Sequence, residues 1–193
     1  MPDPDNKAIK IGVPKESFPG EARVALIPDH IPSIAKVGLK VLFEKNAGVG
    51  SGFSDEQYMK KGAEIIDDRE KLLAASDIIL QVRGLGANLV EWKRDLPYVR
   101  PGQWLIGLFE PLAEPEAVAQ IAETGVTAFA MELMPRITRA QSMDALSSMA
   151  TIAGYKAGER NVESTHSLHC HLVGLHISTE HLHAADPRPN PNR

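Results

Sequence analysis

The sequence is poor in the features that mark several large classes of protein. Its 193 residues include a single cysteine, Cys170, which excludes an internal disulfide framework. No stretch approaches the ~18 consecutive apolar residues that a membrane-spanning helix needs. The formal net charge of −4 lacks the basic excess that is typical of nucleic-acid-binding domains. Residues 1–7 are acidic and contain proline, unlike the basic and apolar regions of a signal peptide.

The composition that remains is that of an ordinary soluble domain. Hydrophobic residues make up 43% and charged residues 24% of the chain, which is enough apolar material for a sizeable core. At roughly 150 residues per domain, the length predicts one domain and a short extension. A complete two-domain dehydrogenase does not fit comfortably in this length. We therefore expect a soluble, cytosolic α/β domain that binds no nucleic acid.

Short apolar runs alternate with helical patterns between residues 8 and 131. This alternation predicts βαβ units, whose right-handed crossovers place helices on both faces of a parallel sheet. The expected fold is a single open, mostly parallel sheet, like the flavodoxin-like or Rossmann-like half of a two-domain protein. Ser54 is expected to cap the helix that follows it. The runs that predict strands are 8–13, 39–43, 63–66, 78–82, 104–109 and 126–131, and the helical patterns cover 29–37, 67–75 and 114–123.

The composition changes after residue 157. Residues 158–193 hold six of the seven histidines and no lysine, and they end in a proline-rich stretch. We therefore divide the chain into a domain at 1–157 and a His/Pro-rich tail at 158–193, which we expect to be disordered. His169 and His171 flank Cys170, and imidazole and thiolate groups suit zinc. Because no second well-spaced ligand pair accompanies them, we expect no metal site.

The stretch from 131 to 157 carries the residues best suited to chemistry. Pro135 breaks the chain after the last expected strand, and a helix is expected to start near Ala140 or Gln141. At 100° per residue, the polar side of this helix is small and almost uncharged. Small polar residues let another helix or subunit approach closely, or they offer donors and acceptors to a polar ligand. On spacing alone, both interpretations stay open. The polar side consists of Gln141, Asp144, Ser147, Ser148 and Thr151.

Four motifs together resemble one enzyme family. They are I-G-V-P-K-E at 11–16, G-E-A-R-V-A-L-I-P at 20–28, A-G-V-G-S-G-F-S-D at 47–55 and R-I-T-R-A-Q-S-M-D at 136–144. The chain resembles, over residues 9–157, the NAD(H)-binding component of the α subunit of proton-translocating NAD(P) transhydrogenases. The wider family includes alanine dehydrogenase. The resemblance implies hydride transfer between NAD(H) and NADP(H), coupled to proton translocation in the full complex.

The resemblance also implies roles for individual residues. Arg136 and Ser147 would hydrogen-bond the carboxamide and neighbouring groups of the nicotinamide. Gln141 would lie at the face where hydride is transferred, and Asp144 would hold Arg136 and the loop in place. Gln141 and Asp144 are therefore the expected catalytic residues. The expected cofactor-binding residues are Arg136, Ile137, Thr138, Arg139, Gln141 and Ser147.

The same resemblance implies partners. NADP(H) would be bound by a separate component, and a membrane-embedded component would form the proton channel. The chain would form a homodimer and would lie in the cytoplasm, peripheral to the inner membrane through its partners.

Two alternatives differ from this assignment. In alanine dehydrogenases, the positions of Arg23, Arg83 and Glu110 hold an arginine, a lysine and a histidine. Arginine does not titrate near neutral pH, and the glutamate replaces the proton-carrying histidine. An alanine-dehydrogenase-like oxidoreductase is therefore disfavoured. The other alternative is a non-catalytic dimerisation module that keeps the family's N-terminal fold.

The sequence lacks the glycine motif of a dinucleotide-binding domain. Gly84-Leu85-Gly86 has Leu89 in the third glycine position, and Gly48-Val49-Gly50 has Phe53 there, so we interpret both as turns. In the family, a Rossmann domain would follow residue 157. We therefore expect a truncated or frame-shifted product of a transhydrogenase α gene, inactive alone and weak in NAD(H) binding.

Overall fold

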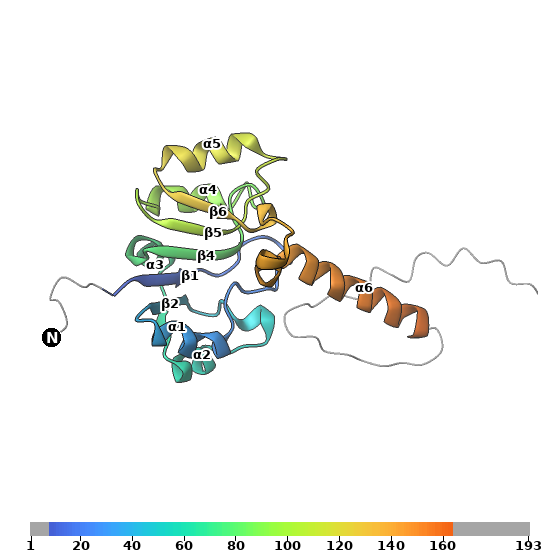
Figure 1. The fold of residues 1–193 in the computed structure, drawn as a ribbon. Helices are drawn as coiled ribbons and strands as arrows, with labels where there is room; N and C mark the ends of the chain where they lie inside the picture. Colours follow the sequence, from blue (N-terminus) through green and yellow to red (C-terminus); the bar gives the residue numbers. More distant parts are fainter. Residues whose placement is uncertain (1–7, 164–193) are drawn as a thin grey trace, which may run out of the picture.

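The computed structural model describes residues 8–163, and the predicted tail lies almost entirely outside them. The chain forms one six-stranded, fully parallel sheet with helices on both faces (Figure 1). The predicted fold class is confirmed. The strands are β1 (Lys10–Val13), β2 (Lys40–Glu44), β3 (Glu64–Ile66), β4 (Ile78–Arg83), β5 (Trp104–Leu108) and β6 (Thr127–Ala130).

The strand order is β3-β2-β1-β4-β5-β6. From β1 the sheet extends to one side through β2 and β3, and then to the other side through β4, β5 and β6, so the order of the strands reverses between β1 and β4. In open α/β sheets, ligands bind outside the carboxyl ends of the strands at such a reversal. The helices are α1 (Ile31–Lys36), α2 (Asp55–Lys61), α3 (Arg69–Ala75), α4 (Trp92–Asp95), α5 (Pro115–Glu123) and α6 (Ala145–Glu163).

Two hydrophobic clusters hold these layers together. On one face, Ile31 of α1 and Tyr58 of α2 pack on Val13 and Phe43 of the sheet. The ring of Tyr58 stacks on that of Phe43 with 3.7 Å between centroids. Side chains that are fully buried in this way each contribute roughly 1.5–3 kcal/mol to stability.

The other face is covered by α3, α4 and α5. Leu72 and Trp92 are buried there against Ile79 of β4 and Leu105 of β5. The indole N–H of Trp92 donates a hydrogen bond to the side chain of Gln81, so the polar atom of this buried ring is satisfied.

Both ends of α2 carry local sequence signals, of which the sequence analysis predicted the first. The backbone N–H of Ser54 donates to Oε1 of Gln57 at 2.8 Å, and together the two residues form a capping box at the start of α2. Gly62 ends α2 with φ of 102°, a conformation that glycine adopts without strain. The predicted cap at Ser54 is therefore confirmed.

The start of the last helix was predicted wrongly. The chain forms a 3₁₀ segment at Thr138–Met143, and α6 begins only at Ala145. Asp144 between them has ψ of 88°, an extended value that separates the two segments. Gln141 therefore does not share a helical face with Ser147 and Thr151. The helix α4 was not predicted either.

Candidate functional site

A cavity of about 570 Å³ opens beside the carboxyl-terminal halves of β4 and β5. Its floor is apolar, and its walls come from the segment after β1 and from the first turns of α6. This is the edge of the sheet at which ligands bind in open α/β folds. The lining residues are Arg23, Val24, Ala25, Ile27, His30, Ser51, Leu80, Gln81, Val82, Ile106, Gly107, Leu108, Met131, Ala145 and Met149.

Two arginines meet on one carboxylate beside this cavity. Nε and Nη2 of Arg23 donate to the two oxygens of Glu21 at 2.7 and 2.6 Å. Nε of Arg83 donates to Oε2 of the same carboxylate at 2.8 Å. The Arg83 guanidinium also stacks over the ring of Phe18, 4.2 Å from its centroid. Both arginines are therefore held in fixed positions by the protein itself.

The ionisation of Glu21 follows from these partners. Burial alone would raise the pKa of its carboxyl, but the hydrogen bonds from Arg23 and Arg83 outweigh burial and lower this pKa to about 2. The arginine pair and Glu21 together carry one net positive charge at neutral pH.

Glu16, in the segment that follows β1, contacts the end of β4. Its two carboxylate oxygens accept the backbone N–H groups of Val82 and Arg83 at 2.6 and 3.1 Å. Burial raises the pKa of Glu16, although the same two N–H groups act to lower it. At the reversal point of the sheet, a side-chain carboxylate of the chain thus occupies backbone donors of the kind that bind phosphate elsewhere.

The first turn of α6 is tied to this arrangement. Nη1 of Arg23 contacts the sulfur of Met149 at 2.8 Å, and Ala145 lines the same cavity. Just before the helix, Oδ1 of Asp144 accepts the backbone N–H of Ser147 at 2.9 Å, and Oδ2 accepts the Ser147 hydroxyl. Asp144 is thus the N-terminal cap of α6.

Three of the predicted site residues are brought together around this cap. The hydrogen bonds from Ser147 lower the pKa of the Asp144 carboxyl, and the positive charge of Arg136 lowers it further. Asp144 is buried, whereas Arg136 and Ser147 are exposed.

The other predicted residues lie on the same exposed loop. Ile137 is 57% exposed, and Thr138, Arg139 and Gln141 are exposed as well. Their side chains point to no partner within the described residues, and they do not line the cavity. The structure therefore leaves these side chains accessible to a ligand, and their predicted roles stay predictions.

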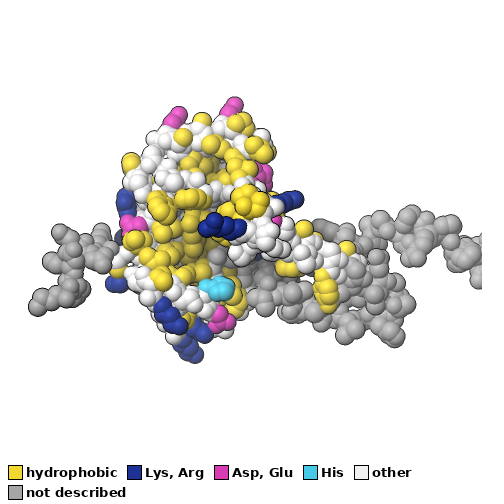
Figure 2. All heavy atoms as spheres, viewed as in Figure 1, with side chains coloured by type: hydrophobic (Ala, Val, Ile, Leu, Met, Phe, Trp, Pro, Cys, Tyr) yellow, Lys and Arg dark blue, Asp and Glu magenta, His cyan; other side chains and the backbone are white. Residues whose placement is uncertain are grey.

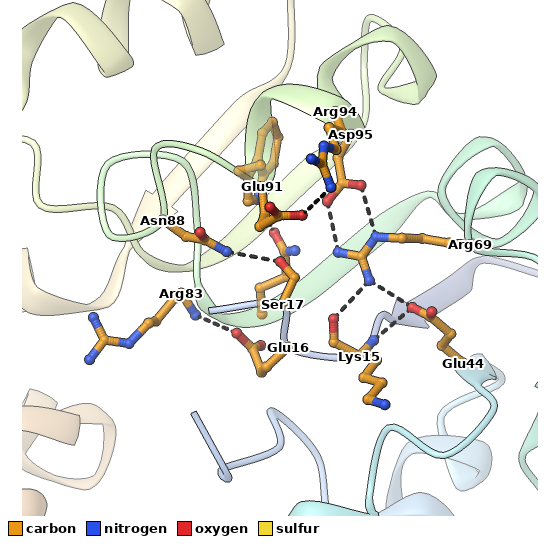
Figure 3. A network of polar contacts seen from close by, with 12 residues as sticks. Lys15, Glu16, Ser17, Glu44, Arg69, Arg83, Asn88, Glu91, Arg94 and Asp95 are labelled. Carbon is orange, nitrogen blue, oxygen red and sulfur yellow. Dashed lines mark hydrogen bonds and ion pairs between the residues drawn. The ribbon is translucent and has the colours of Figure 1, made fainter. Parts of the chain in front are cut away.

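A polar network that shares no residue with the cavity lining was missed by the sequence analysis (Figure 3). Nε and Nη2 of Arg69 donate to the two oxygens of Asp95 at 2.8 and 2.7 Å. Nη1 donates to Glu44 and to the carbonyl oxygen of Lys15, both at 2.7 Å. These partners are far apart in sequence, so no local sequence pattern predicts their contacts. The single guanidinium of Arg69 therefore links the segment after β1, the end of β2 and the end of α4.

The glycine pairs lie in turns. Gly84 and Gly86 pack against the chain after β5, where a Cβ on Gly86 would overlap the carbonyl oxygen of Phe109. In the same place, the backbone N–H groups of Phe109 and Glu110 donate to the carboxylate of Glu132. Glu110 has φ of 48°, a strained value for a residue with a side chain. The sequence analysis did not identify Glu132 as the acceptor of these two N–H groups.

Two further features concern the described residues alone. Within residues 8–163, no helix has the length and apolar character to cross a membrane. No group of three or more potential metal-ligating side chains comes together in that range. The predictions for His169, Cys170 and His171 lie outside it.

The comparisons with known proteins agree with this geometry. The family model "Alanine dehydrogenase/PNT, N-terminal domain" matches residues 12–153. The NAD(P) transhydrogenase subunit alpha of Cereibacter sphaeroides is 46% identical over 149 residues, which cover 77% of this chain and 27% of that subunit. Alanine dehydrogenase 1 of Staphylococcus aureus is 32% identical over 147 residues, covering 76% of this chain and 37% of that enzyme.

A solved structure gives the same result. The transhydrogenase from Sinorhizobium meliloti superposes with a TM-score of 0.70 at 39% identity, over 78% of this chain and 43% of that one. The chain thus spans less than half the length of each of these relatives. It belongs to the alanine dehydrogenase/PNT N-terminal domain family, and it is more similar to transhydrogenase α subunits than to alanine dehydrogenases.

Proposed function

We propose that this chain supplies the nicotinamide-facing wall of an NAD(H) site in a transhydrogenase α subunit. The observation that carries the proposal is the exposed loop at 136–144. Its base is fixed by the cap between Asp144 and Ser147, while its guanidinium and amide side chains stay accessible. A rigid base with free donors is what the positioning of a polar ring requires.

The chemistry of the exposed side chains fits a nicotinamide nucleotide. The guanidinium of Arg136 and the hydroxyl of Ser147 suit the oxygen and nitrogen of a carboxamide. The amide of Gln141 suits a second polar partner on the accessible side of the loop. Bound NAD(H) would supply the hydride chemistry, and the residues of this chain would bind, orient and shield its ring. No acid or base is needed for hydride exchange between two nicotinamides.

Asp144 acts in this proposal through its neighbours. Its ionised carboxylate holds the first turn of α6 through Ser147 and attracts the charge of Arg136. Arg136 is thereby kept beside the helix N-terminus, where the backbone also favours negative or electron-rich groups.

The wider assignment extends the same proposal. A separate component would hold NADP(H), and a membrane-embedded component would form the proton channel. The chain would act as part of a homodimer on the cytoplasmic side of the inner membrane. Residues 1–157 would form the working domain, and the chain alone would be inactive. Its relatives' names, which refer to NAD(P) transhydrogenase, support this assignment.

Isothermal titration calorimetry of the chain with NADH tests the proposal. Arg136→Gln is expected to weaken binding by about 10-fold or more, because a charge-assisted hydrogen bond is worth roughly 1.5–3 kcal/mol. Arg94→Gln is the matched control, since Arg94 forms an exposed ion pair with Glu91 away from the loop. Equal loss in both variants, or no NADH binding by the unaltered chain, would contradict the proposal.

A further inference from the structure

Glu132 connects the sheet to the start of the exposed loop at 136–144. It lies in the 3₁₀ turn Met131–Leu133, which directly follows β6 and precedes Arg136. One of its carboxylate oxygens, Oε1, accepts the backbone N–H of Phe109 at 2.7 Å and also that of Glu110. Both donors belong to the segment that follows β5. The side chain of Glu132 therefore ties the start of the loop to the neighbouring strand.

The segment that Glu132 holds is itself tightly constrained. Glu110 has φ of 48°, and its carbonyl oxygen accepts two backbone N–H groups of the turn that follows it. Gly86, in the turn after β4, approaches the carbonyl group of Phe109 so closely that a Cβ would overlap it. The chain after β5 thus contacts both the turn after β4 and Glu132, and it offers the loop a fixed support.

The loop has few other means of keeping its position. The backbone N–H groups of residues 134, 137 and 140 donate to carbonyl oxygens two or three residues earlier, and such bonds set the shape of a loop but not its place on the sheet. Figure 2 shows hydrophobic side chains gathered over the sheet beside the start of α6, and these offer a polar loop no hydrogen bond. Asp144 holds one end of the loop through Ser147, and Glu132 holds the other.

The contact uses the length of the Glu132 side chain and one acceptor atom. Both N–H groups share Oε1, whereas Oε2 is buried and has no hydrogen-bond partner among the described residues. A side-chain amide oxygen has two lone pairs and would accept the same two bonds. The position that Glu132 imposes can therefore be separated from its charge by mutation.

We propose that Glu132 is a positioning residue for the NAD(H) site. Its carboxylate fixes the place at which the loop leaves the sheet, and so it sets the position of Arg136. The inference rests on the proposed function of the loop. A displacement of about 1 Å in a positioning group can cost roughly 100-fold in rate, so a support outside the site matters to binding and orientation within it.

Three variants of Glu132 separate position from charge. Glu132→Ala removes the acceptor and is expected to weaken NADH binding, measured by calorimetry, by about fivefold or more. Glu132→Asp keeps the charge but is one methylene shorter, and it is expected to weaken binding as well. Its smaller change means that loss of fold in Glu132→Ala does not decide the result. Glu132→Gln keeps the length and the acceptor oxygen, and it is expected to bind NADH as the unaltered chain does.

Limited proteolysis with trypsin, without nucleotide, gives an independent readout. Arg136 and Arg139 are exposed, and trypsin cleaves after arginine, so a loop that leaves its support more often is cut faster. Glu132→Ala and Glu132→Asp are expected to raise the cleavage rate at these two arginines several-fold. Glu132→Gln is expected to leave the rate unchanged. Mass spectrometry of the fragments identifies the cleaved bonds.

Asp55→Ala is the matched control. The two carboxylate oxygens of Asp55 accept the backbone N–H of Asn46 at 2.9 and 3.1 Å, and Asn46 has φ of 62°. Asp55 thus also holds the backbone of a non-glycine residue with positive φ, but after β2, on the other half of the sheet. Its loss is expected to lower the melting temperature and to change neither NADH binding nor cleavage at Arg136 and Arg139.

Three results would overturn the inference. The first is a cleavage rate at the loop that Glu132→Ala and Glu132→Asp leave unchanged. The second is a loss of NADH binding in Glu132→Gln as large as in Glu132→Ala, because charge rather than position would then matter. The third is the same set of changes in Asp55→Ala, which would show a general loss of stability. If the unaltered chain bound no NADH, the proposed function would fail instead, and the cleavage rates alone would decide whether Glu132 positions the loop.

Discussion

The carboxylate of Asp144 accepts the backbone N–H of Ser147 at 2.9 Å and thereby sets where α6 begins. The positive charge of Arg136 lowers the pKa of the same carboxyl. One side chain therefore caps the helix and interacts electrostatically with Arg136 of the loop that precedes it. Its replacement should change both the stability of the helix start and the proposed NAD(H) site, so the loss of a different helix cap is the control.

Asp144→Ala is expected to lower the melting temperature by a few degrees, because an N-terminal cap is lost. It is also expected to weaken NADH binding several-fold, because Arg136 loses its neighbour. Asp68→Ala removes the cap of α3, where Asp68 accepts the Lys71 N–H at 3.2 Å, and should lower the melting temperature alone. Calorimetry with NADH and thermal unfolding separate the two effects. An equal change in NADH affinity in both variants would refute the assignment.

The pKa of Glu21, lowered to about 2 from 4.5, predicts a pH dependence of stability. Above pH 4.5 the carboxylate is ionised in both folded and unfolded chains, and its stabilisation is complete. As the pH falls from 4.5 towards 2, the unfolded chain takes up a proton that the folded chain does not, so stability is lost. Urea unfolding at pH 7 and pH 3 should show a smaller loss for Glu21→Gln than for the unaltered chain. Glu64→Gln, at an exposed position, should leave the loss unchanged.

Arg69→Met is expected to lower the free energy of unfolding by about 3 kcal/mol, because it leaves the buried carboxylate of Asp95 without its partner. The Asp95 side chain is only 6% exposed. In Arg94→Met, the lost ion pair is exposed, and the expected change is within about 1 kcal/mol. Chemical denaturation measures both. Similar losses in the two variants would mean that burial does not govern this network.

Two glycine substitutions should act in opposite directions. Gly86→Ala is expected to destabilise the chain by about 1–3 kcal/mol, because the new methyl group meets the backbone of Phe109. Gly154→Ala in α6 meets no atom within 4 Å, and it should stabilise the helix by up to about 1 kcal/mol. Thermal unfolding of the two variants checks the signs. Stabilisation by Gly86→Ala would show that the turn is looser than described.

The four inner strands β1, β2, β4 and β5 were predictable because each carries buried residues on at least one face. Residues such as Ile79 and Leu105 belong to short apolar runs, and the runs alternate with helical patterns that force parallel crossovers. The start of α6 was not predictable from the same evidence. Apolar and small residues continue from Met143 into Leu146, so the periodicity hides the break that the Asp144 cap makes.

The candidate site was predictable only in part. The loop residues could be proposed because they are close in sequence and form one motif, and their roles stay predictions. The contacts of Glu21 with Arg83, and of Arg69 with Asp95, join residues far apart in the chain. Charged residues are also common on protein surfaces. Residue type alone therefore did not distinguish the charged residues that form these buried contacts from those that are exposed to solvent.

The position of Glu16 determines what its loss would do to the sheet. Its carboxylate accepts the backbone N–H groups of Val82 and Arg83. Without that side chain the two donors at the end of β4 would lose their acceptor, so a residue outside the strands completes the hydrogen bonding at the middle of the sheet.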